Sequence, residues 1–174
     1  MIRKWIVVSI VSLLFSFDQR VARASGPIEI GISRIDITPD HAVRLTGYGA
    51  RRNVFDSVEQ KLWAKALVLG QKGKPTMVWI TLDLIGFQGF FADALFTRLT
   101  QKIGLKNRAQ LVLSASHTHN GPETGVLVNI SGETVPPNQL ADVKPYSDGV
   151  PDKLERLVAN AYSSKAPGKL SWTV

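Results

Sequence analysis

MVWITL, residues 77–82, is a nearly unbroken apolar run, which is typical of a β-strand in the middle of a sheet with both of its faces covered. Over residues 91–103 the apolar side chains recur at helical spacing, and Gly104 is suited to end a helix in a left-handed conformation. Residues 110–116 (QLVLSAS) favour a strand again. This order predicts a mixed α/β fold, in which a strand–helix–strand unit pairs its two strands in parallel.

The flanking sequence extends this unit on both sides. Residues 28–33 alternate as a strand does, and residues 61–70 (KLWAKALVLG) form a second candidate strand. Residues 121–148 are rich in Gly, Pro, Asn and Ser, and predict one long loop, a feature that is usually functional. We expect a last helix to begin near Pro151 and a last strand to begin at Gly168.

The first 24 residues have the layout of a secretory signal peptide. Arg3 and Lys4 precede an apolar run over residues 6–17, and small residues lead to a cleavage point after Ala24. The run is shorter than the roughly 20 residues that span a bilayer, so an uncleaved anchor is the weaker alternative. We therefore expect an exported protein, periplasmic or secreted, with residues 25–174 as a single soluble domain and no later membrane span.

Composition narrows the chemistry that the chain can perform. The sequence has no cysteine, so a metal would have to be bound by histidine, carboxylate or tyrosine. The formal charge of +7 includes a net +3 from the leader (Arg3, Lys4, Arg20 and Arg23 against Asp18), which leaves +4 for the remainder. So small and scattered a charge does not indicate a nucleic-acid partner.

His117 and His119 are the residues most suited to catalysis or metal binding. If the strand before them continues, the two imidazoles point the same way, and they follow the carboxyl end of a parallel strand, where ligands bind in such sheets. Asp83 follows the neighbouring strand, either to orient a metal-bound histidine or to cap the next helix. The alternative for the histidine pair is two loop residues without a role.

Other polar residues admit a functional and a structural interpretation. We interpret His41 as an exposed loop residue. Glu123 is either a general base or, as we favour, a solvated loop residue. Tyr48, Arg51 and Arg52 either line a cleft or lie in a surface turn.

Four segments together resemble one family. They are GISRIDITP at 31–39, LTGYG at 45–49, QKLWAKA at 60–66 and SASHTHNGP at 114–122. In this combination the chain resembles the neutral/alkaline non-lysosomal ceramidases, particularly their bacterial branch, through nearly all of residues 25–174. Asn120 is a departure, because the family usually has serine there.

The resemblance implies a zinc amidase that cleaves the N-acyl bond of ceramide to give sphingosine and a fatty acid. It makes His117 a zinc ligand, and His119 a residue that faces the substrate and stabilises the oxyanion. A second histidine, a glutamate and a tyrosine complete the family's zinc shell, and they come from beyond Val174. The resemblance thus implies one zinc ion with its other ligands outside this chain, and no activity from these residues alone.

Two alternatives to an enzyme stay open at this point. The chain could be an exported, non-catalytic module that binds lipid or carbohydrate on the same partial fold, and metal content distinguishes the two. It could also be a truncated product, since residues 170–174 (LSWTV) read as the start of a strand. The sequence does not give the oligomeric state or the acyl chain of the substrate.

Overall fold

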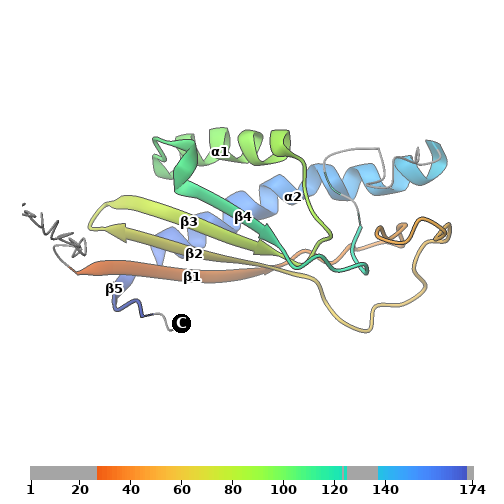
Figure 1. Ribbon diagram of the computed structural model, residues 1–174, viewed down its shortest axis with the longest axis horizontal. Helices are drawn as coiled ribbons and strands as arrows, with labels where there is room; N and C mark the ends of the chain where they lie inside the picture. Colours follow the sequence, from red (N-terminus) through yellow and green to blue (C-terminus); the bar gives the residue numbers. More distant parts are fainter. Residues whose placement is uncertain (1–26, 123, 125–136, 172–174) are drawn as a thin grey trace, which may run out of the picture.

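The computed structural model describes residues 27–122, 124 and 137–171, which form a five-stranded mixed sheet with two α-helices (Figure 1). The strand order is β4-β3-β2-β1-β5. The elements are β1 (Ile28–Asp36), β2 (Trp63–Gln71), β3 (Lys74–Leu82), α1 (Gly89–Ile103), the 3₁₀ turn η1 (Arg108–Gln110), β4 (Leu111–Ala115), α2 (Pro137–Ser163) and β5 (Ala166–Gly168).

The predicted strand–helix–strand unit is confirmed. β3 and β4 are parallel neighbours, paired from Val78 opposite Leu111 to Leu82 opposite Ala115, and α1 connects them. Gly104 ends α1 at φ 74°, where its N–H donates to the carbonyl of Thr100. β1, β2 and β3 pair antiparallel, so the sheet is mixed, as the α/β prediction requires.

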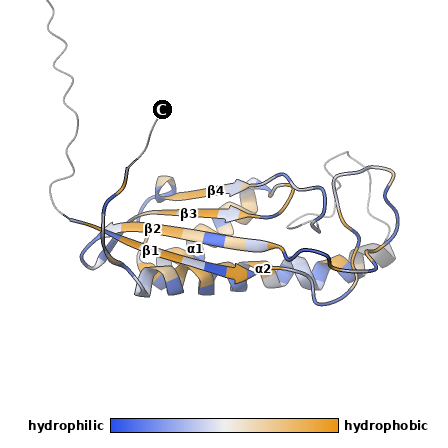
Figure 2. Cartoon of the chain, turned by 90° about the horizontal axis from the view of Figure 1, so that it is seen from below, coloured by the Kyte–Doolittle hydropathy of each residue, from blue (hydrophilic) through white to orange (hydrophobic). Residues whose placement is uncertain are grey.

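A single apolar layer fills the space between the sheet and the helices. Both helices lie on the same side of the sheet, and the strands carry long hydrophobic stretches (Figure 2). The core joins the inward side chains of the strands with one face of each helix, and its fully buried members include Val68, Val78, Ile80, Leu82, Leu95, Leu99, Leu154 and Leu157. Burial at about 25 cal/mol per Å² of apolar surface is the main force that holds these layers together.

Helix α2 approaches strand β1 unusually closely. A Cβ atom on Gly31 would lie 1.8 Å from the carbonyl oxygen of Ala161, so only glycine fits at that position. Two residues along the strand, the hydroxyl of Ser33 donates to the carbonyl of Leu157 at 2.6 Å. At this point, α2 and β1 are therefore joined by a close backbone contact and a hydrogen bond instead of by packed side chains.

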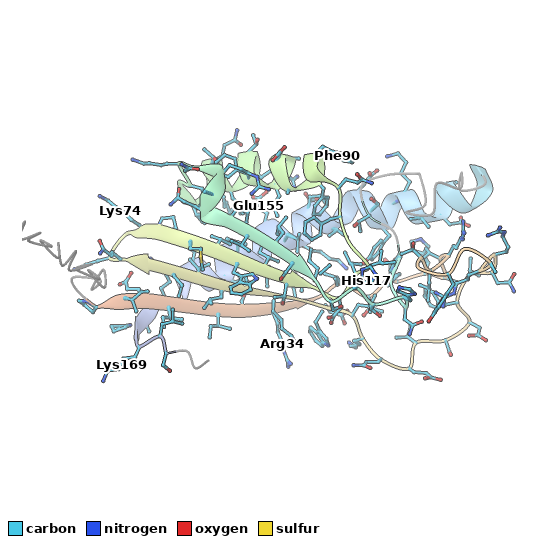
Figure 3. All side chains as sticks on the ribbon, viewed as in Figure 1. Arg34, Lys74, Phe90, His117, Glu155 and Lys169 are labelled. Carbon is cyan, nitrogen blue, oxygen red and sulfur yellow. The ribbon has the colours of Figure 1, made fainter. Side chains whose placement is uncertain are left out.

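The prediction that MVWITL is covered on both faces is wrong. β3 lies inside the sheet, but only one of its faces meets the helices, and Trp79 is 43% exposed on the other. The register places Trp79 in a cross-strand row with Ile32, Leu67 and Val112, and Ile32 is 71% exposed. Arg34 also lies on this open side of the sheet (Figure 3). The apolar run thus arises because β3 has apolar side chains on both faces. Within the described residues, the helices cover only one of these faces.

The predicted loop over residues 121–148 is wrong in its last part, because α2 begins at Pro137 and contains Pro145 and Pro151. Each proline removes a backbone hydrogen bond and disfavours the helix. The helix persists because buried side chains recur along it at intervals of three and four, namely Val143, Tyr146, Val150, Leu154, Leu157, Val158 and Ala161. Packing of this stripe outweighs the local cost.

The predicted last strand is displaced. β5 covers only Ala166–Gly168 and pairs antiparallel with β1, Gly168 lying opposite Ile28. Among the described residues, the pairing with β1 ends at Gly168. Residues 172–174 and the predicted leader, 1–24, lie outside the described residues. Within the described part, neither α-helix has the length and hydropathy of a bilayer-spanning segment.

Candidate metal and catalytic site

The carboxyl ends of β3 and β4 bring the predicted polar residues to one end of the sheet. The amide of Ser116 donates to the carbonyl of Leu82 at 2.9 Å, which keeps the two strands together until they end. His117 lies just beyond the strand tips (Figure 3). This is the edge at which parallel strands present their ligands.

His117 has a fixed orientation and one free ring nitrogen. Its Nδ1 lies 2.9 Å from the carbonyl oxygen of Ile85. A carbonyl only accepts hydrogen bonds, so this contact requires a proton on Nδ1, and in the neutral tautomer with that proton the lone pair is on Nε2. The residue is exposed. Its φ of 59° lies in the left-handed region, which is unusual for residues other than glycine. An oriented Nε2 lone pair with a backbone-bonded Nδ1 is the arrangement of a metal-bound histidine.

His119 lies beside His117 but is held by a different segment. The two ring centroids are 5.3 Å apart with 64° between the planes, and the ring of Tyr48 meets His119 edge-on at 4.7 Å. The prediction of a shared face assumed that the strand continued, whereas β4 ends at Ala115. The two imidazoles are adjacent in the loop that follows β4, where His117 has a positive φ instead of a strand conformation.

Segment 44–52 wraps around the residues that follow His119. The amide of Thr46 donates to the carbonyl of Gly121 at 2.9 Å, and Leu45 forms a β-bridge with Pro122. Gly47 adopts φ 106°, and a Cβ atom there would lie 2.5 Å from Cγ of His119. The glycine of LTGYG is thus required both by its backbone conformation and by the imidazole beside it.

Arg51 contacts the loop of residues 116–122 that carries His117 and His119, the histidine loop. The sequence interpretations, a cleft wall or a surface turn, did not include this contact. The Nη1 of Arg51 donates to the carbonyl of His119 at 2.6 Å and to that of Thr46 at 3.3 Å, and its guanidinium lies 4.9 Å from the Tyr48 ring centroid. The only sequence signal was its position shortly after the LTGYG motif. Arg52 bonds to the carbonyl of Gly49 instead.

Asp83 has a structural role that neither sequence interpretation foresaw. Its Oδ2 accepts from the amide of Trp63 at 3.0 Å, and its own amide donates to the Trp63 carbonyl at 2.9 Å. Helix α1 starts several residues later, after Gln88, without a side-chain cap. Asp83 therefore closes the end of the β2–β3 pair.

A cavity of 590 Å³ lies beside the histidine loop, between the strand ends and the segment 55–62. Asp83, Ser116, Thr118 and Asn120 line it, and neither His117 nor His119 does. The loop thus presents its even-numbered side chains to the cavity. The two imidazoles are exposed and half-buried, respectively, outside it.

The remaining candidates lie apart from this group. His41 is exposed, with Nε2 near the carbonyl of Asp142 and Nδ1 near Asp40, and these two contacts raise the pKa of its imidazole. Glu123 lies outside the described residues. Among the residues that the structure does describe, no three His, Asp or Glu side chains converge as a complete metal site would require.

Known proteins are similar to this chain over the region that forms the sheet, the helices and the candidate site. The family model for the neutral/alkaline non-lysosomal ceramidase N-terminal region matches residues 28–172. A neutral ceramidase of Pseudomonas aeruginosa is 27% identical over 99 residues, covering 55% of this chain and 15% of the relative. Neutral ceramidase 3 of Arabidopsis thaliana is 26% identical over 143 residues, covering 81% of this chain and 19% of the relative.

Solved structures have the same fold at low sequence identity. The chain superimposes on the crystal structure of neutral ceramidase from Pseudomonas aeruginosa with a TM-score of 0.61, and on a ceramidase complexed with C2 with 0.64. Sequence identity is 22% in both cases, and the match covers 82% of this chain and 22% of each solved chain. The chain therefore spans about a fifth of the length of these relatives.

Proposed function

The chain belongs to the neutral/alkaline non-lysosomal ceramidase family, and we propose that it forms the amino-terminal part of a zinc-dependent hydrolase that cleaves the N-acyl bond of ceramide-like lipids. One observation carries the chemical part of this proposal. His117 is oriented through Nδ1 by the Ile85 carbonyl at 2.9 Å, and its Nε2 is left to bind a metal beside a second imidazole.

His117 fits one position of a zinc shell. A neutral imidazole whose second nitrogen donates to a backbone carbonyl is a common zinc ligand. Catalytic zinc needs about three protein ligands, so the other ligands of this ion would come from outside the described residues. When bound, zinc polarises the scissile carbonyl and lowers the pKa of a bound water to about 7.

We assign to His119 the stabilisation of negative charge in the reaction, and its place beside His117 supports this assignment. Its ring lies beside His117 and is partly exposed, so a substrate carbonyl held next to His117 is within its reach. Attack on the amide carbonyl places negative charge on the carbonyl oxygen, and a hydrogen bond donated by the His119 imidazole stabilises that charge. A fixed ring orientation matters because such donors act through preorganisation.

Zinc content measured beside turnover of an N-acyl sphingosine tests this function. We expect the 174-residue chain alone to bind zinc weakly and to hydrolyse no faster than background. In a form that includes the missing ligands, chelation should abolish activity and zinc should restore it. There His117→Ala should lose the metal, whereas His119→Ala should keep most of the zinc and lose about 10²- to 10³-fold in kcat.

Two results would contradict the proposal. One is strong hydrolysis by the 174-residue chain that chelators do not affect. The other is zinc retention by His117→Ala equal to that of the unaltered protein. In the longer form, zinc content no higher than that of His117→Ala, together with no turnover of any N-acyl lipid, would favour the non-catalytic module instead.

Export of the protein also belongs to this proposal, and the leader sequence alone supports it. Arg3, Lys4 and the apolar run over residues 6–17 predict secretion and cleavage after Ala24. Amino-terminal sequencing of the exported product should therefore begin at Ser25. An uncleaved, membrane-retained chain would contradict this part.

A further inference from the structure

We propose that Arg51 is a positioning residue for His119, and that it acts together with Gly47 and Tyr48 to hold the imidazole in one orientation. The inference rests on the role proposed above for His119. It concerns residues of segment 44–52, which is distant from the histidine loop in the sequence but contacts it in the fold.

Within the part of the chain that the structure describes, no regular strand pairing supports His119. β4 ends at Ala115 and the chain turns at His117, so regular strand pairing does not fix the backbone at position 119. The bond between His117 and the Ile85 carbonyl holds the neighbouring histidine only. The orientation of His119 therefore depends on contacts made by segment 44–52.

Arg51 supplies the main polar contact to His119. Its guanidinium donates to the His119 carbonyl at 2.6 Å, a charge-assisted hydrogen bond, and the same nitrogen reaches the Thr46 carbonyl at 3.3 Å. A weaker contact from Nη2 to Oδ1 of Asn120 measures 3.5 Å. One side chain thus ties the loop that carries His119 to the turn that carries Gly47.

Arg51 is itself held in place by contacts with Arg44 and Tyr48. The buried side chain of Arg44 donates through Nε to the Arg51 carbonyl at 3.0 Å, and the Arg51 amide donates to the Tyr48 carbonyl at 3.0 Å. The guanidinium also lies 4.9 Å from the Tyr48 ring, within the range of a cation–π contact. A donor whose backbone is fixed loses less freedom when it binds the loop.

The imidazole ring of His119 is positioned by Gly47 and Tyr48. Gly47 leaves the space that the ring occupies, since a Cβ atom there would meet His119 Cγ at 2.5 Å. Tyr48 meets the ring edge-on at 4.7 Å. The backbone anchor from Arg51, the space at Gly47 and the ring contact with Tyr48 together restrict His119 to one side-chain orientation.

The test uses the three histidines of the chain as probes. His41, His117 and His119 are its only histidines, so Cε1–H signals of ¹³C-labelled histidine report each site separately. Arg51→Ala should move the His119 signal most, change that of His117 less and leave that of His41 in place. Carbethoxylation of His119, followed by mass spectrometry, should become about tenfold faster, as expected when one charge-assisted hydrogen bond is lost.

Arg108→Ala is the matched control. Like Arg51, Arg108 donates to a backbone carbonyl, that of Leu111 at 2.8 Å, but at the start of β4, the opposite end of the strand from the loop that carries His119. Its replacement should leave the His119 signal and modification rate unchanged. Arg51→Lys keeps the charge and one donor, so it should give an intermediate change confined to His119, and it serves as the test if Arg51→Ala does not fold.

The inference is overturned if Arg51→Ala, or Arg51→Lys in its place, leaves His119 as in the unaltered chain, or if Arg108→Ala disturbs His119 equally. None of these measurements needs turnover or zinc. A failure of the positioning role is thereby distinguished from a failure of the proposed function, which the activity and zinc assays test separately.

Discussion

The helix-covered face of the sheet and the loops at its carboxyl end both depend on a glycine, for different reasons. Gly31 lets the backbone of α2 approach β1 to within 1.8 Å of where a Cβ would lie. Gly47 makes room for the ring of His119 and adopts φ 106°. One glycine serves the packing of two secondary-structure elements, and the other makes room for a side chain of the candidate site. The comparison indicates that stability and chemistry are placed in separate regions.

The largest effect on stability should come from the core. Leu157 on α2 is fully buried, so Leu157→Ala should lower the free energy of unfolding by about 2–5 kcal/mol through lost burial and a residual cavity. Chemical denaturation measures the loss. Val112→Ala, on the open face where Val112 is 38% exposed, is the control and should cost under about 1 kcal/mol. Equal losses would show that the open face is as well packed as the covered one.

The two glycines allow a direct test of the separation. Gly31→Ala should cost about 1–3 kcal/mol, because the new methyl group meets backbone that cannot move freely, and it should leave the histidine signals unchanged. Gly47→Ala should cost about 1–2 kcal/mol from its positive φ and should displace the His119 signal. Calorimetry and histidine NMR on both variants measure the two effects. A displaced His119 signal in Gly31→Ala would contradict the separation.

The smallest effect is expected where the two regions join. Lys61 at 2.8 Å and the Thr38 side chain and amide hold the pKa of Asp36 at about 2, below its ordinary 3.8. Because the folded-state pKa is the lower one, this contribution to stability is present above about pH 4 and is lost as the pH falls through 2. The pair is exposed to solvent, so Asp36→Asn should cost under about 1 kcal/mol at pH 7.

Unfolding midpoints of Asp36→Asn and the unaltered chain, measured from pH 7 to pH 2, check this prediction. The difference between them should shrink as Asp36 becomes protonated in the folded chain. A difference that stays constant over this range would assign the stabilisation to some group other than the Asp36 carboxylate.

Sequence patterns predicted the parallel unit and the two earlier strands well, because each element carries a complete local signal. MVWITL, the helical spacing over residues 91–103 and Gly104 each specify a structure within a few residues of chain. The errors arose where the deciding contact was distant. The sequence predicts a loop around Pro145 and the start of a helix near Pro151, yet α2 passes through both because its buried stripe meets the sheet.

At the candidate site the sequence by itself determined which residues are the candidates for the chemistry. The SASHTHNGP segment at residues 114–122 and its resemblance to a family predicted His117 and His119 as the site residues, and the strand before them predicted their place at the carboxyl edge of the sheet. Only the tertiary structure decided how each imidazole is held, through the Ile85 carbonyl for His117 and through Gly47, Tyr48 and Arg51 for His119. The physical reason is that strand and helix periodicities follow from neighbouring residues, whereas these contacts join segments that are brought together only when the sheet and its loops have folded.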